Sequence, residues 1–306
     1  MRIITKSCKL NGHEMRSEIT FLVIALCVTV ASIDEAAAAE IRRQASYYVI
    51  EGEIENGDFD KFEALVRLRG MFVHSVAIGS PGGDMMEAMR IGRLVREMRL
   101  STSSALMMVP GKKTKSLFIK DLSNDICASS CFYIFIAGID RFGHVLGIHR
   151  PYLSDEDYKR MNIDDAIEAS KFLKTMVKDY FVEMGVSTDY VDRAFSISSN
   201  EIEWLKRDEI EKYFFGLIPE IDEWVSARCP KLTEAEALIY GDDYVGSWET
   251  MSVVEKKLFK QASDKSFQIS KCKWGEMDVM SCRAWDKKYN ERDSYPYPCE
   301  LQGYTN

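Results

Sequence analysis

Histidine is scarce in this sequence, and the positive charges are fewer than the negative ones. Its 306 residues include only four histidines, and Asp and Glu outnumber Lys and Arg by 48 to 40, which gives a formal net charge of -8. An acidic chain has no electrostatic reason to bind nucleic acid or an anionic membrane surface. The cysteines also lack the paired CxxC spacing of a zinc site, so the sequence predicts neither a metal nor a cofactor.

Long apolar runs are lacking too, and the one candidate lies near the N-terminus. Residues 19–33 are apolar but fall short of the roughly 20 residues that a membrane-spanning helix needs. Basic residues precede this run, and Ala37-Ala38-Ala39 gives an A-x-A cleavage site before Glu40, as in a secretory signal peptide. We therefore expect residues 1–39 to be a leader and the mature protein to be periplasmic, with no stable membrane insertion after cleavage. An uncleaved anchor at residues 19–33 is the alternative.

Six cysteines remain after such a leader is removed. An even number of cysteines in an exported chain indicates disulfides, whose pairing the sequence leaves open. We expect those beyond residue 220 to be oxidised among themselves, whereas for the first two both helix packing and a local disulfide remain open. The six are Cys127, Cys131, Cys229, Cys272, Cys282 and Cys299.

Apolar patterns of the strand type and of the helix type alternate along residues 40–220. The expected strands are residues 47–54, 71–78, 102–109 and 145–149, and the expected helices are residues 58–69, 84–98, 129–138 and 155–184. Strands that alternate with helices predict an α/β fold with largely parallel pairing. The composition changes after Pro219, so we expect residues 221–306 to form a mainly helical, disulfide-stapled C-terminal appendage.

Three short motifs carry the chemistry. One motif is Ala128-Ser129-Ser130, at the start of the expected helix 129–138. A wholly apolar segment follows it. A hydroxyl at such a helix start lies beside unpaired backbone N–H groups. Ile148-His149-Arg150-Pro151 supplies an imidazole, and Ser80-Pro81-Gly82-Gly83 follows a strand. Taken singly, these motifs are typical of a helix cap, a strand residue and an ordinary turn.

Together, in this order and spacing, the three motifs resemble the Clp-type serine peptidases, most of all their exported bacterial relatives. The resemblance covers residues 47–218 and implies a ClpP/crotonase-like spiral of β-β-α units. It implies that Ser129 is the nucleophile and His149 the general base. It also implies that the N–H groups of Gly83 and Ser130 bind the oxyanion. Cys131 is an alternative nucleophile, although the match places it one turn beyond the nucleophile position.

The third member of a catalytic triad does not follow from the motifs. The family places an aspartate shortly before a segment similar to residues 204–217, whereas this sequence has Asn200 and Glu201 there. Either side chain could accept a hydrogen bond from His149. Loss of the acid can lower turnover about 10⁴-fold, so a catalytically silent binding or scaffold protein of the same fold is the alternative function.

The implied function is that of a serine-type peptidase-like hydrolase of the bacterial cell envelope. It would act on a peptide or protein substrate, without nucleic acid, and it could form a homo-oligomer. Residues 229–240 and 282–289 also resemble small exported cysteine-bearing modules of the lysozyme-inhibitor type, with Tyr240 at the position of one expected cysteine. A disulfide-stapled extension that stabilises the first domain is the other interpretation of residues 221–306.

The leader gives the first testable prediction. When the protein is made in a Gram-negative host, we expect the mature chain to begin near Glu40 and to appear in the periplasmic fraction, because residues 1–39 carry the parts of a cleavable signal. N-terminal sequencing of the fractionated protein checks this. Recovery of intact residues 19–33 in the membrane fraction would instead identify an anchor.

Overall fold

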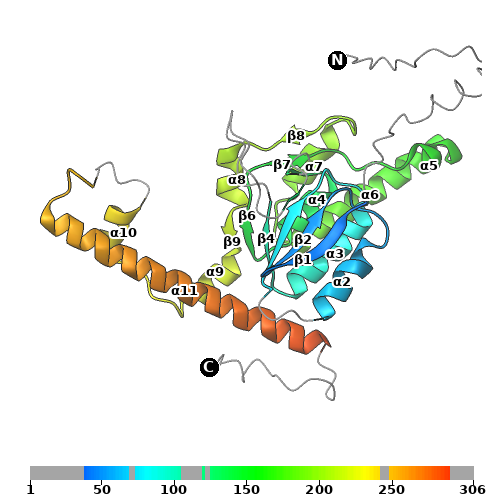
Figure 1. The fold of residues 1–306 in the computed structure, drawn as a ribbon. Helices are drawn as coiled ribbons and strands as arrows, with labels where there is room; N and C mark the ends of the chain where they lie inside the picture. Colours follow the sequence, from blue (N-terminus) through cyan, green and yellow to red (C-terminus); the bar gives the residue numbers. More distant parts are fainter. Residues whose placement is uncertain (1–37, 69–72, 105–118, 121–124, 242–247, 290–306) are drawn as a thin grey trace, which may run out of the picture. The chain divides into compact units, whose positions relative to one another are not determined.

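The described part of the chain has a mixed α/β arrangement with a helical C-terminal part (Figure 1). The computed structural model describes residues 38–68, 73–104, 119–120, 125–241 and 248–289. The strands are β1 (Glu40–Gln44), β2 (Tyr47–Glu51), β3 (Ser75–Gly79), β4 (Ser101–Ser103), β5 (Cys127–Ala128), β6 (Asp140–Phe142), β7 (Leu146–Ile148), β8 (Glu203–Trp204) and β9 (Gly216–Leu217). Residues 1–37 of the expected leader, residues 105–109 of the expected strand and Cys299 lie outside the described residues.

Ten helices are described between and after these strands. They are α2 (Asp58–Arg67), α3 (Met85–Glu97), α4 (Ser130–Ile136), α5 (Asp155–Arg160), α6 (Ile163–Glu183), α7 (Asp189–Ser196), α8 (Arg207–Tyr213), α9 (Pro219–Ser226), α10 (Glu234–Tyr240) and α11 (Val253–Tyr289). None of the helices in the described ranges is long and apolar enough to cross a membrane.

The larger sheet has six strands in the order β1-β2-β3-β4-β6-β9. Its four inner strands pair in parallel, and β1 and β9 pair antiparallel at the two edges. All five residues of β3 are buried, which fits a central strand of a parallel sheet that is covered on both faces. The α/β class and the largely parallel pairing expected from the sequence are therefore present. The finer arrangement as a spiral of β-β-α units stays a prediction.

The smaller sheet has the order β5-β7-β8, with β5 and β7 parallel and β7 and β8 antiparallel. It meets the larger sheet through a parallel bridge between Ser80 and Cys127. Ser80 donates its N–H to the carbonyl of Ile126 (2.8 Å) and accepts from the N–H of Ala128 (3.1 Å). The end of β3 is thus fixed directly beside β5.

Helix α3 shows why the local sequence folds as it does. Asp84 caps it by accepting a hydrogen bond from the N–H of Glu87 (3.0 Å), as expected of an aspartate at that position. The predicted apolar side of the helix is buried: Ala88, Ile91 and Val95 are 0% exposed. This face packs against α4, whose seven residues are all buried.

One expected element differs from the structure. A continuous helix over residues 155–184 was expected, but α5 ends at Arg160 and α6 begins at Ile163. Met161 is in an extended conformation, and Asn162 caps a new helix by accepting from the N–H of Asp165 (2.9 Å). The side chain of Asn162 competes with the helical backbone hydrogen bonds, which favours a helix start over a helix interior.

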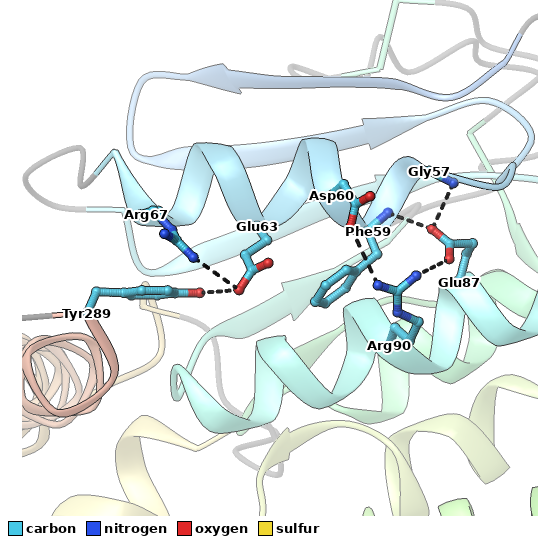
Figure 2. Close-up of polar contacts among 8 residues, drawn as sticks. All are labelled: Gly57, Phe59, Asp60, Glu63, Arg67, Glu87, Arg90 and Tyr289. Carbon is cyan, nitrogen blue, oxygen red and sulfur yellow. Dashed lines mark hydrogen bonds and ion pairs between the residues drawn. The ribbon is translucent and has the colours of Figure 1, made fainter.

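A buried carboxylate joins α2 to α3 (Figure 2). Glu87 accepts hydrogen bonds from the N–H groups of Gly57 (3.1 Å) and Phe59 (2.8 Å) and from Arg90 (2.6 Å). Gly57 and Phe59 lie at the start of α2, so Glu87 satisfies backbone N–H groups that this helix leaves unpaired. Burial raises the pKa of Glu87, but the bonds from Phe59, Arg90 and Gly57 outweigh that effect and hold the pKa below its usual range.

The 37-residue helix α11 packs on the α/β part through specific contacts. Ser281 donates to the carbonyl of Arg99 (2.8 Å), and the indole N–H of Trp285 donates to the carbonyl of Val66 (2.9 Å). Figure 2 shows Tyr289, at the end of α11, beside Glu63 of α2. The C-terminal part is mainly helical, as expected, and its end is fixed on α2 and on the turn after α3.

Disulfides are present in both parts of the described chain. Cys229 is bonded to Cys272, which ties the segment after α9 to α11. Cys282 is also oxidised in a disulfide. Cys127 is bonded to Cys131, so the alternative of a local disulfide is the one that the structure contains.

The contact between α2 and α3 gives a stability prediction. Replacement of Glu87 by alanine should lower the free energy of unfolding by about 1.5–3 kcal/mol, because it removes a charged acceptor from backbone donors. Urea denaturation measures this. The matched control is Asp60→Ala, which removes the exposed partner of Arg90 and should change the free energy by no more than about 0.5 kcal/mol.

The contribution of Glu87 to the free energy of unfolding also has a defined pH dependence. The folded-state pKa of Glu87 is lowered, so its contribution is present above the unfolded-state pKa and is lost as the pH falls through the folded-state pKa. The difference in stability between wild type and Glu87→Ala should therefore shrink below about pH 4. Equal stability of the Glu87→Ala and Asp60→Ala proteins at neutral pH would contradict the assignment.

Candidate functional site

Ser129 occupies the tight connection between β5 and α4. Its backbone angles are φ 56° and ψ -124°, a conformation that costs a non-glycine residue about 1–3 kcal/mol. The N–H of Ser129 donates to the carbonyl of Gly147 in β7 (3.0 Å), and its carbonyl accepts from the N–H of Phe132 (3.0 Å). Strained residues of this kind persist only where their surroundings fix them, and they concentrate at functional sites.

The Pro-Gly-Gly turn lies directly against Ser129. Gly82 has φ 118°, and a Cβ placed on it would lie 2.6 Å from the Cβ of Ser129. Only glycine therefore allows the turn to approach the serine this closely. The side chain of Ser80 also shapes the turn, because its Oγ accepts from the N–H of Gly82 (3.1 Å).

Gly83 presents its peptide groups toward the start of α4. The neighbouring residues make the strand pairing: Ile54 donates to the carbonyl of Gly82 and accepts from the N–H of Asp84, both at 2.7 Å. In a parallel bridge of this kind, the N–H and C=O of the middle residue point away from the partner strand. The carbonyl of Gly83 accordingly accepts from the Oγ of Ser130 (2.6 Å), and its N–H lies on that same side.

His149 follows directly after β7 and is half-buried. Its Nδ1 lies 2.9 Å from the carbonyl oxygen of Arg150. A carbonyl oxygen can only accept, so this contact assigns the proton to Nδ1 and leaves the lone pair of Nε2 available. Burial lowers the pKa of His149, with a smaller opposing effect from the Arg150 carbonyl. Burial therefore favours the neutral imidazole, which is the form that a general base requires.

A cavity of about 910 Å³ brings the three motifs together, because Gly82, Gly83, Ser129, Ser130 and His149 all line it. Most of its remaining wall is apolar, from α3, α4, α6 and the segments next to them, with Met85, Met86, Tyr133, Tyr152, Leu153, Met161, Phe172, Leu173, Met176 and Ile202. Such a volume is typical of ligand sites. The cavity can therefore hold part of a substrate, such as one or two side chains of a peptide, next to Ser129.

A second cavity, of about 1220 Å³, contains none of the predicted site residues. Arg96, Arg141 and residues of α11 such as Arg283 line part of it. Its described lining includes no serine, cysteine or histidine, so it offers no nucleophile and base pair. Although it is the larger of the two, the predicted site residues line the cavity at Ser129.

Asn200 and Glu201, the two residues expected near His149, lie in different surroundings. Asn200 lines the cavity with His149, and its Oδ1 accepts a hydrogen bond from the Oγ of Ser198. Glu201 is exposed, and its N–H closes a turn onto the carbonyl of Ser198 (3.1 Å). The contact described for the ring of His149 is with Arg150. A role for Asn200 or Glu201 as the third member stays a prediction.

Two features of the site did not follow from the motifs. The carbonyl of Arg150 orients the ring of His149. Every residue has a backbone carbonyl, so the sequence alone could not identify this contact. The side chain of Arg150 donates to the carbonyl of Phe195 (3.0 Å), which anchors that residue. Cys131, the alternative nucleophile, is bonded to Cys127 and so has no free thiol. Among the described residues, no group of His, Cys, Asp and Glu could hold a metal ion.

Comparison with known proteins finds similarity among solved structures only. No family model matches the chain, and no curated protein matches it. Among solved structures, the chain is similar to a mutant of ClpP1 from Listeria monocytogenes, with 15% identity, a TM-score of 0.38, and coverage of 55% of this chain and 87% of that chain. Because that TM-score is low, only the geometry of the site bears on function.

The base gives a titration prediction. The NMR signal of the His149 ring should titrate with a midpoint below about 6.5, because burial disfavours the imidazolium and the carbonyl of Arg150 carries no full charge to offset it. The His149→Gln protein assigns the signal by its loss. A midpoint above 6.5 would show that a carboxylate reaches the ring, and Glu201→Gln would then identify it.

Proposed function

We propose that this protein is a serine-type peptidase-like hydrolase of the bacterial cell envelope, with Ser129 as the nucleophile and His149 as the general base. The observation that carries the proposal is the strained backbone of Ser129 in the wall of a cavity that it shares with His149 and the Gly82-Gly83 turn. A serine that only caps a helix does not require this conformation. The cap of α3, Asp84, has an ordinary extended backbone (φ -64°).

The base has the protonation state that the first step needs. As the Oγ of Ser129 attacks the carbonyl carbon of the substrate, its proton passes to Nε2 of His149. The ring keeps its other proton on Nδ1, where the carbonyl of Arg150 accepts it. The resulting imidazolium then donates the Nε2 proton to the leaving amine, and water releases the acyl group in a second round of the same transfers.

Two backbone donors would stabilise the negative charge that develops on the substrate oxygen. The N–H of Gly83 lies on the side of the turn that faces Ser130, and the N–H of Ser130 is at the first position of α4, where the helix provides no acceptor. Loss of one such donor typically lowers turnover by about 10²–10³-fold. The bond from the Oγ of Ser130 to the carbonyl of Gly83 keeps the two donors together.

The cavity supports a peptide or protein as the substrate. Its apolar wall suits an apolar side chain, and the net charge of -8 gives no attraction for nucleic acid. The bonded cysteines support the envelope as the compartment, because disulfides persist where the surroundings are oxidising. We extend the proposal to a ClpP/crotonase-like spiral, which the adjacent parallel strands β2, β3 and β4 support.

A catalytically silent binding protein is the second candidate, and one observation favours it. The contact described for Nδ1 of His149 is a backbone carbonyl, which stabilises an imidazolium less than a carboxylate does. On this alternative, the cavity at Ser129 binds a peptide without cleaving it.

A fluorophosphonate probe separates the two candidates. We expect wild-type protein to be labelled at Ser129 and Ser129→Ala to be unlabelled. The matched control is Ser130→Ala, which keeps the backbone N–H and loses only the bond to Gly83, so its labelling rate should fall by no more than about tenfold. His149→Gln should lower the rate by about 10²–10⁴-fold, because it removes the base. Mass spectrometry of the labelled peptide reads out the site.

The outcomes against the proposal are distinct. Labelling that persists in Ser129→Ala would show that another residue is the nucleophile. A folded wild-type protein that is not labelled at all would support the silent binding protein.

A further inference from the structure

The disulfide between Cys127 and Cys131 encloses Ser129. Cys127 belongs to β5, Cys131 lies in the first turn of α4, and Ser129 is the middle residue of the five-residue loop that the bond closes. Both cysteines are 0% exposed. The bond therefore spans the connection in which the chain adopts its strained conformation.

The two ends of this loop are held by different parts of the fold. The N–H of Cys127 donates to the carbonyl of Val145 (3.0 Å), and Cys127 pairs with Leu146 of β7. Cys131 belongs to α4, which packs on α3. The disulfide thus fixes the end of a strand to the start of a helix, and the backbone of Ser129 must turn between these fixed points.

The length of the loop indicates a local function. In the chain-entropy model, a disulfide stabilises the whole fold more when it closes a longer loop. Cys229 and Cys272 are separated by 43 residues, whereas Cys127 and Cys131 are separated by four. The shorter bridge restricts mainly the residues that it encloses, and among these only Ser129 has a positive φ.

We propose that the Cys127–Cys131 disulfide is a positioning device that holds Ser129 in its reactive conformation. The inference rests on the proposed function and deepens it. The two cysteines touch neither the substrate nor the transferred proton, so they act through Ser129. Without the bridge, the loop can relax toward common backbone angles, which moves the Oγ of Ser129 and the N–H of Ser130. A displacement of 1 Å in such groups can cost about 10²-fold in rate.

This arrangement makes the reactivity of the site depend on oxidation. Two thiols lose two electrons and two protons when the bond forms, and an oxidant that is itself a disulfide takes them up and becomes two thiols. Before oxidation, the conformation of Ser129 is not fixed, so the chain is about 10²-fold less reactive in a reducing compartment. Because both sulfur atoms are buried, the bond is formed once during maturation and is not cycled in the folded protein.

The test compares the two disulfides of the mature protein with the fluorophosphonate probe. Cys127→Ala/Cys131→Ala should lower the second-order rate constant of labelling by about 10²-fold or more. The matched control, Cys229→Ala/Cys272→Ala, should stay within about threefold of wild type because its bond lies outside the site. The midpoint of the pH profile of labelling should be unchanged in both, since neither alters His149. A general loss of structure would not leave that midpoint in place.

Refolding provides the rescue. Wild-type protein that is reduced in denaturant and refolded with oxidised glutathione should regain its labelling, because two protein thiols and one glutathione disulfide give the bridge and two glutathione thiols. The Cys127→Ala/Cys131→Ala protein should gain nothing from the same treatment. If the alanine variant does not unfold cooperatively, Cys127→Val/Cys131→Ala replaces it, because valine fills more of the space that the sulfur atoms leave.

The failures are distinguishable. If wild-type protein is not labelled, the proposed function falls and the inference falls with it. If wild type is labelled and a folded variant without the 127–131 bond is labelled within about threefold of it, the proposed function stands and the positioning role is overturned.

Discussion

The backbone pairing at the end of β3 is the constraint on which the site depends. Ser80 holds the segment before Ser129 through two hydrogen bonds, and Ile54 holds the Gly82–Asp84 turn through two more. These bonds use main-chain groups alone, so they fix positions without consuming the side chains that carry the chemistry. Three segments that are distant in the sequence therefore meet at one point, with the hydroxyl and the glycine turn on the same side.

The opposite wall of the site depends on the smaller sheet. Gly147 accepts the hydrogen bond from Ser129, and His149 follows two residues later. The short strand β8 pairs with β7 and brings residues 198–202 to the same end. The position of His149 relative to Ser129 is thus set by strand register, which allows far less variation than a free loop would.

Much of this arrangement could be predicted from the sequence. Strong periodic patterns located β2, β3, α2 and α3, because long apolar faces leave few alternatives. The three motifs led to residues that line one cavity. By contrast, β5, β8 and β9 are two residues long and leave no periodic pattern to detect. The docking of α11 also escaped prediction, since contacts such as Trp285 to the carbonyl of Val66 join residues far apart in the chain.

The partner of His149 is a main-chain oxygen, and this has a consequence for how the site would look to a mutational survey. Side-chain substitutions would reveal the contributions of Ser129 and His149 to activity. They would not reveal the carbonyl of Arg150, because that group is retained in every substitution that leaves the backbone in place. Any effect of replacing Arg150 would come from loss of the hydrogen bond that its side chain donates to the carbonyl of Phe195. The group that selects the tautomer of the base is therefore encoded by the path of the chain and not by the identity of a residue.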